Sequence, residues 1–211
     1  MSDTRTLSQF KSRLAGGGAR SNLFEAVIPS FPSAVGDRVW RSGAGRESQT
    51  FSFLCKAAQL PASTIAEVPV PFRGRTLKVA GDRTFEPWTV TVINDEDFQL
   101  RTAFETWMNV MSKLNDATGV TNPSSYMTDA YVTQLGRGRV ANSTRNTGGQ
   151  SSDLRTYKFF DIFPTEVSAI DLSYDNTDQI EEFQVTFQVQ FFTIGNSTQA
   201  NRAATGQTLI Q

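Results

Sequence analysis

The feature that most constrains the fold is a strict alternation of apolar and polar residues near the end of the sequence. Between Phe183 and Phe191, Phe or Val stands at every second position, with Gln or Thr between them. Because successive side chains of a strand point to opposite faces of a sheet, this pattern predicts one buried face and one polar, uncharged face. We therefore expect a mainly β fold in which the strand Glu182–Thr193 covers the core.

A hairpin partner for this strand is expected directly before it. Tyr157–Phe163 and Glu166–Tyr174 are predicted strands separated by Pro164, and residues 175–178 would form the turn. The second of them would place three side chains in the core: Ile170, Leu172 and Tyr174. The outer face of the hairpin would then carry Asp171, Ser173, Gln184, Thr186, Gln188 and Gln190.

Earlier segments show shorter versions of the same alternation. We expect strands at Asn22–Pro29, Thr50–Leu60, Arg83–Asn94 and Tyr126–Gln134. In the second of these strands one face would carry Phe51, Phe53, Cys55 and Ala57, so Cys55 is interpreted as a small core residue. The polar, glycine-rich stretches 30–49 and 136–153 are interpreted as loops.

One segment has helical rather than strand periodicity. Asp97–Asn115 follows acidic residues suited to the positive N-terminal end of a helix, and Asn94 or Asp95 is expected to cap it. Its large apolar residues recur three and four positions apart, which predicts one buried stripe. The stripe would consist of Leu100, Phe104, Trp107, Met108, Met111 and Leu114.

A proline-rich hairpin is predicted over residues 61–83. Val68-Pro-Val-Pro-Phe leads into Arg73, Gly74 and Arg75, and Thr76-Leu-Lys-Val returns. Pro69 and Pro71 remove hydrogen-bond donors along one side, so the hairpin should lie at a sheet edge or stand off the body. Ordering such a hairpin buries little in a monomer, whereas an oligomer can use it as a strut.

The chain is expected to have three parts. Residues 1–20 would form an N-terminal docking arm, because Leu7, Phe10 and Leu14 are spaced as on a short amphipathic helix and three glycines follow. Residues 21–195 would form a single β domain that includes the hairpin 61–83 and the helix 97–115. Residues 196–211 would form a polar C-terminal tail.

Composition argues against catalysis. The 211 residues include no His and one Cys, which excludes Ser-His and Cys-His nucleophile pairs, disulfides within the chain and cysteine zinc sites. The acidic cluster at residues 95–97 is explained by helix capping, and the one at 175–181 lacks the spacing of a calcium loop. We expect no enzymatic activity, no metal and no cofactor.

Charge is unevenly distributed although the net charge is only −1. Residues 1–83 hold 12 Lys or Arg against 6 Asp or Glu, whereas residues 84–211 hold 8 against 15. Between Phe159 and Asn201 there are seven acids and no basic residue. This split suits head-to-tail contacts between copies, and the 15 Arg against 5 Lys also favours an interface-forming subunit. No apolar run reaches the ~18–20 residues of a membrane span, so we expect no membrane association.

Short segments along most of the chain resemble one known family. They are Leu7-Ser-Gln-Phe-Lys, Asn22-Leu-Phe-Glu, Ala58-Gln-Leu-Pro, Pro71-Phe-Arg-Gly-Arg, Val79-Ala-Gly-Asp, Phe85-Glu-Pro-Trp-Thr-Val-Thr-Val-Ile-Asn-Asp, Phe104-Glu-Thr-Trp, Phe163-Pro-Thr-Glu-Val-Ser and the alternating C-terminal strand. In this order and spacing they resemble the tail tube protein of contractile-tailed bacteriophages, a structural relative of the type VI secretion tube protein.

The resemblance implies a β-sandwich or barrel of two packed antiparallel sheets with one flanking helix. It also implies hexameric rings that stack into a tube, with the sheath protein around it, the tape-measure protein inside it during assembly, and baseplate proteins at its end. DNA would pass through the lumen without specific binding. The protein would be assembled in the host cytoplasm and reside in the virion.

Two sets of residues are candidates for these roles. Contacts between subunits and rings would involve Leu7, Phe10, Leu14, Pro69, Pro71, Arg73, Gly74 and Arg75, and the polar face named above would line the lumen. Three alternatives remain: a tube protein of a related injection or secretion system, a baseplate tube initiator, and a monomeric β-sandwich binding module. The last would leave the hairpin, the arm and the charge split without a purpose.

Overall fold

The computed structural model describes residues 7–13, 18–32, 35, 46–136, 153–175 and 178–195. The chain divides into two compact units, which are described separately. Unit 1 consists of Met1–Glu25, Thr133–Thr156 and Ile194–Gln211, and unit 2 of Ala26–Val132 and Tyr157–Thr193. The expected arm residue Leu14, the polar tail 196–211, and most of the expected loops 30–49 and 136–153 lie outside the described residues.

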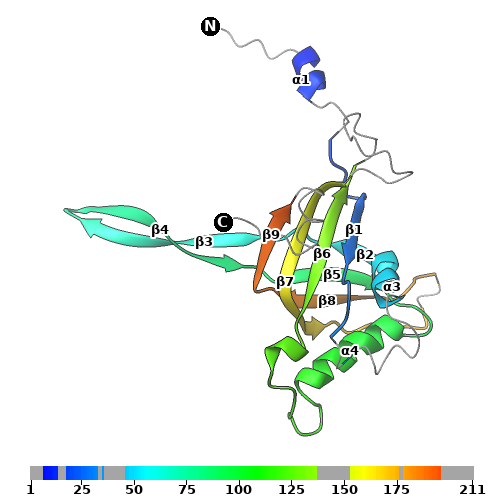
Figure 1. Cartoon of the computed structure of the whole chain (residues 1–211). Helices are drawn as coiled ribbons and strands as arrows, with labels where there is room; N and C mark the ends of the chain where they lie inside the picture. The colour runs from blue at the N-terminus through cyan, green and yellow to red at the C-terminus, as the bar shows by residue number, and fades with distance from the viewer. Residues whose placement is uncertain are drawn as a thin grey trace, which may run out of the picture. The chain divides into compact units, whose positions relative to one another are not determined.

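Strands dominate the described part of the chain, as the alternating patterns predicted (Figure 1). In chain order the elements are α1 (Leu7–Arg13), β1 (Phe24–Val27), α3 (Arg46–Leu54), β2 (Cys55–Ala58), β3 (Ser63–Phe72), β4 (Arg75–Phe85), β5 (Trp88–Ile93), α4 (Gln99–Met111), the 3-10 turn η1 (Pro123–Ser125), β6 (Thr128–Leu135), β7 (Asp153–Val167), β8 (Glu182–Gln188) and β9 (Phe191–Gly195).

The strands form two antiparallel sheets. A seven-stranded sheet has the order β1-β6-β7-β8-β5-β2 with β9 also paired to β7, and β3 and β4 form a separate two-stranded sheet. In Figure 1, β5 and β8 run across β6 and β7, and the last residues of the 15-residue β7 pair with β8. The large sheet therefore folds over its own core, which confirms the mainly β fold with a flanking helix.

Aromatic rings fill the core of unit 2. Trp88 of β5 stacks on Phe159 of β7 with the ring centroids 4.7 Å apart, and Phe187 lies 5.4 Å from Trp88. From helix α4, Phe104 approaches Phe187 to 5.8 Å. The indole nitrogen of Trp88 donates to the carbonyl of Gln59 at 3.0 Å. The predicted inward residues of β5 and β8 are thus buried: Trp88, Val90, Val92, Phe183, Val185 and Phe187.

Helix α4 is shorter than the predicted Asp97–Asn115. It ends at Met111, and Leu114 is 93% exposed rather than part of the buried stripe. The backbone becomes extended at Ser112 (φ −151°, ψ 108°). A hydrogen-bonded turn follows, in which Asp116 accepts from the backbone and side chain of Thr118, with Ala117 in the left-handed region. The buried residues of the helix are Leu100, Ala103, Phe104, Trp107 and Val110. At the other end Asp95 Oδ1 accepts from the backbone N–H of Gln99, at 3.2 Å.

The predicted strand Thr50–Leu60 is wrong over its first half. Residues up to Leu54 belong to helix α3, and β2 holds only Cys55–Ala58. In a helix, residues two positions apart lie on nearly opposite faces, so Phe51 is buried against Phe104 whereas Phe53 is 83% exposed. Cys55 is buried as expected, and a register shift after it turns Ala57 outward.

The predicted hairpin partner of the last strand, Glu166–Tyr174, is correct only for its first two residues and wrong beyond Val167. β7 continues through Pro164, where a register shift follows the proline, and it is Phe163–Val167 that pairs with β8. The ladder then closes because Ser168 donates its N–H to the Gln184 carbonyl (2.8 Å) and accepts the Gln184 N–H with Oγ (2.9 Å).

Between this closure and β8, the residues that the structure describes form no helix and no strand. Residues 168–181, called the linker below, contain no strand among their described residues, and Leu172 and Tyr174 are exposed instead of buried. The last strand is divided in two as well: β8 ends at Gln188, and Phe191 begins β9 with 42% of its surface exposed.

Candidate assembly surfaces

The β3–β4 hairpin of unit 2 is the first candidate surface. It extends away from the sheet of its unit in Figure 1. Its two-residue turn places Arg73 at φ 45° and Gly74 at φ 80°, the left-handed conformations that such a turn requires. All residues of β3 are exposed, and so is almost all of β4. The sequence prediction of a hairpin with Gly74 at the turn is confirmed.

The hairpin has an apolar and a polar face. Cross-strand partners Val68–Val79 and Val70–Leu77 share one face, and Phe72 ends it opposite Arg75. The five apolar side chains on this face, Val68, Val70, Phe72, Leu77 and Val79, are 43% to 67% exposed. The opposite face carries Pro69, Pro71, Thr76 and an ion pair between Lys78 and Glu67 at 2.8 Å. No packing partner within the described chain covers the apolar face.

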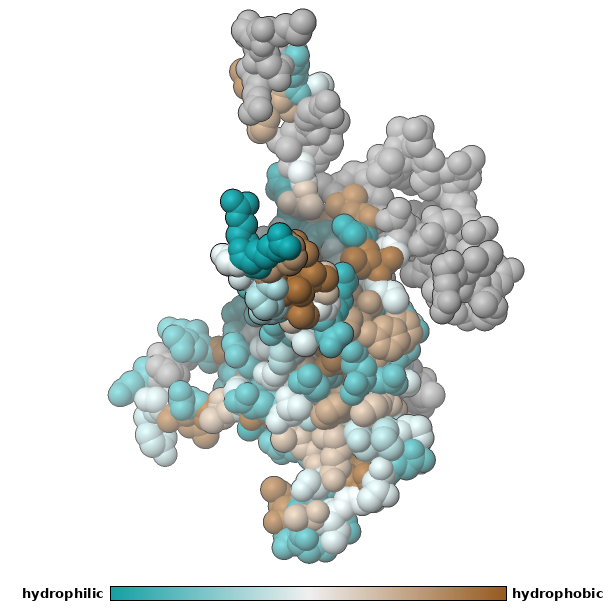
Figure 2. All heavy atoms as spheres, turned by 90° about the vertical axis from the view of Figure 1, so that its left-hand side faces the viewer, coloured by the Kyte–Doolittle hydropathy of each residue, from teal (hydrophilic) through white to brown (hydrophobic). Residues whose placement is uncertain are grey.

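The tip of the hairpin combines aromatic and basic groups. The guanidinium of Arg73 lies over the Phe72 ring, 5.4 Å from its centroid, and Arg75 is the cross-strand partner of Phe72. Figure 2 looks onto this end of the hairpin and shows apolar side chains directly beside strongly hydrophilic ones. Arginine and exposed aromatic rings are the residue types enriched in interface cores. The structure thus brings together Pro69, Pro71, Arg73, Gly74 and Arg75 from the predicted contact set.

Two features fix the hairpin to the body and shape it. At its base Phe85 packs edge-on against Phe192, with centroids 5.4 Å apart. Farther out, a register shift after Ile65 makes a bulge at which Gly81 comes close to β3. A Cβ at Gly81 would lie 3.0 Å from the Ala66 carbonyl oxygen, which explains why glycine stands there.

The outer face of β8 is the second candidate surface. Gln184 and Thr186 are aligned with Thr91 and Thr89 of β5, so the neighbouring strands add more uncharged polar groups. Thr165 donates its hydroxyl to the Thr186 carbonyl at 3.1 Å. The predicted lumen residues Gln184, Thr186 and Gln188 lie on this one face, and Gln190 is exposed between β8 and β9.

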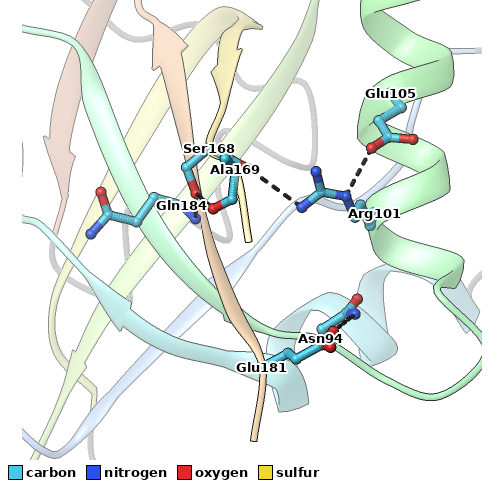
Figure 3. Close-up of polar contacts among 7 residues, drawn as sticks. All are labelled: Asn94, Arg101, Glu105, Ser168, Ala169, Glu181 and Gln184. Carbon is cyan, nitrogen blue, oxygen red and sulfur yellow. Dashed lines mark hydrogen bonds and ion pairs between the residues drawn. The ribbon is translucent and has the colours of Figure 1, made fainter. Parts of the chain in front are cut away.

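Two predicted lumen residues do not share that face. Asp171 and Ser173 are exposed in the linker, because the strand expected to carry them ends at Val167. The ends of the linker are held by polar contacts, which Figure 3 shows. Arg101 of α4 donates to the Ser168 carbonyl at 3.3 Å, and Asn94 Nδ2 donates to the Glu181 carboxylate at 2.8 Å.

The N-terminal arm belongs to unit 1. Helix α1 spans Leu7–Arg13, and its side chains Leu7 and Phe10 are 68% and 62% exposed. A helix is therefore present in the expected arm, and its two described apolar side chains are exposed.

Groups with chemical reactivity are sparse in the part of the chain that the structure describes. No three Cys, Asp or Glu residues in it are grouped as metal ligands would be, and none of its helices is long and apolar enough to cross a membrane. Burial raises the pKa of the Cys55 thiol to about 12. The thiol is therefore neutral at physiological pH.

The sequence relatives decide the family. The model of a family described as phage tail tube protein matches residues 19–194. The chain belongs to this family. It is 32% identical over 179 residues to tail tube protein gp19 of Enterobacteria phage T4, covering 84% of this chain and 93% of the relative. The gp19 protein of Enterobacteria phage T6 matches with the same identity and coverage.

Solved structures support the fold of this tail tube protein. A chain of the anti-feeding prophage baseplate matches with a TM-score of 0.54 at 10% identity, covering 85% of this chain and 96% of the other. A chain of the sheath/tube terminator of an extracellular contractile injection system matches with a TM-score of 0.53 at 12% identity, covering 84% and 96%. Tail tube proteins are structural components of phage tails.

The apolar face of the hairpin was missed by the sequence reasoning. The signal was present in Val68, Val70 and Phe72, which alternate with the two prolines. The predicted contact residues on the hairpin are Pro69, Pro71 and the turn residues Arg73, Gly74 and Arg75, and this set does not include the apolar face.

Proposed function

We propose that this protein is the repeating subunit of the inner tube of a contractile phage tail, and that it assembles into stacked hexameric rings that form a conduit for DNA. The observation that carries the proposal is the hairpin, whose apolar face is exposed over its full length. A monomer gains little from ordering such a ribbon, and a monomeric binding module has no use for it.

The hairpin and the arm would make the contacts between subunits and rings. Fully burying an exposed Val, Leu or Phe side chain is worth about 1.5–3 kcal/mol. The five side chains are 43% to 67% exposed in the monomer, so covering them would gain roughly half of that value for each. Repetition of the contact around a ring would add to this gain, which works against the cost of association of about 4–15 kcal/mol. Leu7 and Phe10 of α1 offer a second, smaller apolar surface of the same kind.

The uncharged face of β8 would line the lumen. Gln and Thr side chains form only weak, exchangeable hydrogen bonds with a passing phosphate backbone. The stretch from Phe159 to Asn201 also contains no Lys or Arg that would bind that backbone. Such a surface lets DNA slide, whereas a basic groove would retain it.

The remaining roles follow from a position inside a tail. The sheath protein would surround the tube, the tape-measure protein would occupy the lumen during assembly in the host cytoplasm, and baseplate proteins would nucleate the first ring. The subunit would need no cofactor and perform no catalysis.

Electron microscopy of the purified chain tests the proposal. Negatively stained samples at increasing concentration, alone and with a nucleating baseplate, should show stacked rings or hollow tubes. Deletion of residues 69–78 should abolish polymerisation and leave the body folded, because the hairpin stands off the sheet. A matched control, Leu114→Ser, changes a side chain that is 93% exposed elsewhere and should assemble normally. A wild-type chain that stays monomeric under both conditions contradicts the proposal.

A further inference from the structure

The two free edges of the hairpin differ in their capacity to hydrogen-bond. Opposite residues in an antiparallel ladder alternate between pairs that exchange both backbone hydrogen bonds and pairs whose N–H and C=O groups point away from the partner strand. Pro69 is opposite Lys78 and Pro71 opposite Thr76. Proline has no N–H, so these are suited to be outward-pointing pairs.

This alternation blocks one edge and leaves the other open. The outer edge of β3 lacks donors at both prolines. The outer edge of β4 presents the N–H and C=O groups of Thr76 and Lys78, and no further strand pairs with it in the described chain. An open edge of this kind is a template for another strand.

The linker has the complementary property. Its residues 170–175 alternate in the manner of a strand, with Ile170, Leu172 and Tyr174 between Asp171, Ser173 and Asp175. The structure nevertheless gives them no strand partner, and Leu172 is 79% exposed while Tyr174 is fully exposed. The monomer therefore contains a strand-like segment in the linker that pairs with no sheet edge. It also contains an open sheet edge, that of β4, which pairs with no further strand.

The two segments start from opposite ends of the β5–β8 pair. In the register of β5 and β8, Trp88 is opposite Phe187 and Ile93 is opposite Glu182. The hairpin joins β5 at its Trp88 end, and the linker joins β8 at the Glu182 end, about 17 Å away at 3.4 Å per residue. The hairpin also points outward from its end of the sheet in Figure 1. The two do not pair within the described chain, so a second copy is the source of the partner that we consider.

We propose that the linker of one subunit adds as a third strand to the β4 edge of the hairpin of a neighbouring subunit. Leu172 and Tyr174 would extend the apolar face of the neighbour's hairpin. Charge favours the match, because residues 63–85 hold four basic and two acidic residues whereas residues 168–181 hold four acids and no base. Such a contact joins different surfaces of identical subunits, which is the type that closes into rings. The inference rests on the proposed function.

Substitution of the backbone donor provides the sharpest test. Lys78→Pro removes an N–H that points away from β3, so the hairpin should still form, while the open edge is blocked. Lys78→Ala removes the same side chain and keeps the N–H. We expect the proline variant to lose rings and tubes at concentrations at which the alanine variant and the wild type form them. Circular dichroism and thermal unfolding would establish that both variants are folded.

Disulfide trapping tests the pairing directly. A Leu77→Cys chain mixed with a Leu172→Cys or Tyr174→Cys chain should form a cross-linked heterodimer on oxidation during assembly. Mixing Leu77→Cys with Leu114→Cys is the matched control and should give none. The natural Cys55 is buried and should not interfere.

The outcomes separate this inference from the tube function. Wild-type tubes without the cross-link, or normal assembly of Lys78→Pro, would overturn the strand pairing and leave the tube function intact. A wild-type chain that never assembles would overturn the tube function and the pairing with it.

Discussion

Strand β8 and the hairpin strand β3 obey the same local rule with opposite results. Both alternate apolar residues with a second residue type, Gln or Thr in β8 and mainly Pro in β3. In β8 the apolar side chains are at most 1% exposed, whereas in β3 none of the described residues is buried. The period of two determines which side chains share a face, and the location of a partner determines whether that face is covered. The apolar face of β8 is covered within its own chain, whereas nothing in the described chain covers the apolar face of β3.

Of the substitutions that test this comparison, truncation of a core ring should cause the largest loss in the free energy of unfolding. Phe187→Ala removes a ring that is fully buried among Trp88, Phe104 and Trp107. We expect a loss of about 3–5 kcal/mol in the free energy of unfolding, measured by urea denaturation. Assembly should fail as a consequence of unfolding. A loss below about 1 kcal/mol would mean that this ring does not support the packing of β8 against α4.

The same substitution on the hairpin should separate assembly from stability. Phe72 is 67% exposed, so Phe72→Ala should change the unfolding free energy by less than about 0.5 kcal/mol. Tubes should nevertheless be reduced sharply or lost, because an aromatic anchor is removed from the contact. Denaturation and electron microscopy of one preparation measure both quantities. A Phe72→Ala monomer with a lower free energy of unfolding would show that residues of the same chain cover the apolar face of the hairpin.

The outer face of β8 should tolerate change better than either apolar face. Gln188→Lys should leave the unfolding free energy and tube formation unchanged, because the side chain lies on the outer face of β8, opposite the buried residues. It should slow genome delivery, since six copies would place a positive ring along the path of the DNA. Gln188→Glu is the matched control and should deliver normally. Equal rates of genome delivery by both variants would contradict the proposal that this face lines the lumen.

Much of the β8 region could be predicted from sequence, because the apolar residues of its alternating pattern are buried by other residues of the same chain. The inward residues of β5 and β8 and the stripe at Leu100, Phe104 and Trp107 were all correct. The sequence predictions failed in two situations. In one, a short apolar pattern fits a helix as well as a strand; in the other, a strand pattern has no neighbouring strand within the chain. Phe51 and Phe53 fit a strand as well as they fit a helix over so short a stretch, and only packing against Phe104 decides for the helix.

The linker and the hairpin faces show a second limit. Residues 170–175 have a strand pattern but no strand in the monomer, because Ser168 closes the ladder with its side chain. The hairpin was predicted from its prolines and Gly74, yet the importance of its apolar face became visible only once the exposed fractions of Val70 and Phe72 were known. Sequence patterns record the tendency of a segment to form a strand, and they do not record which molecule supplies its neighbour.

The smallest effect at neutral pH concerns the thiol on the buried side of β2. Because burial raises the pKa of Cys55 to about 12, above the value of 9.0 expected when exposed, the folded state binds a proton that the unfolded state releases. The resulting stability is present below about pH 9 and is lost as the pH rises towards 12. Cys55→Ala should remove this part of the alkaline loss of unfolding free energy.

In a Leu77→Cys chain, a thiol reagent at pH 8 should label the hairpin and leave Cys55 unlabelled until the chain unfolds. Equal labelling of both thiols would contradict the difference in burial between the two regions.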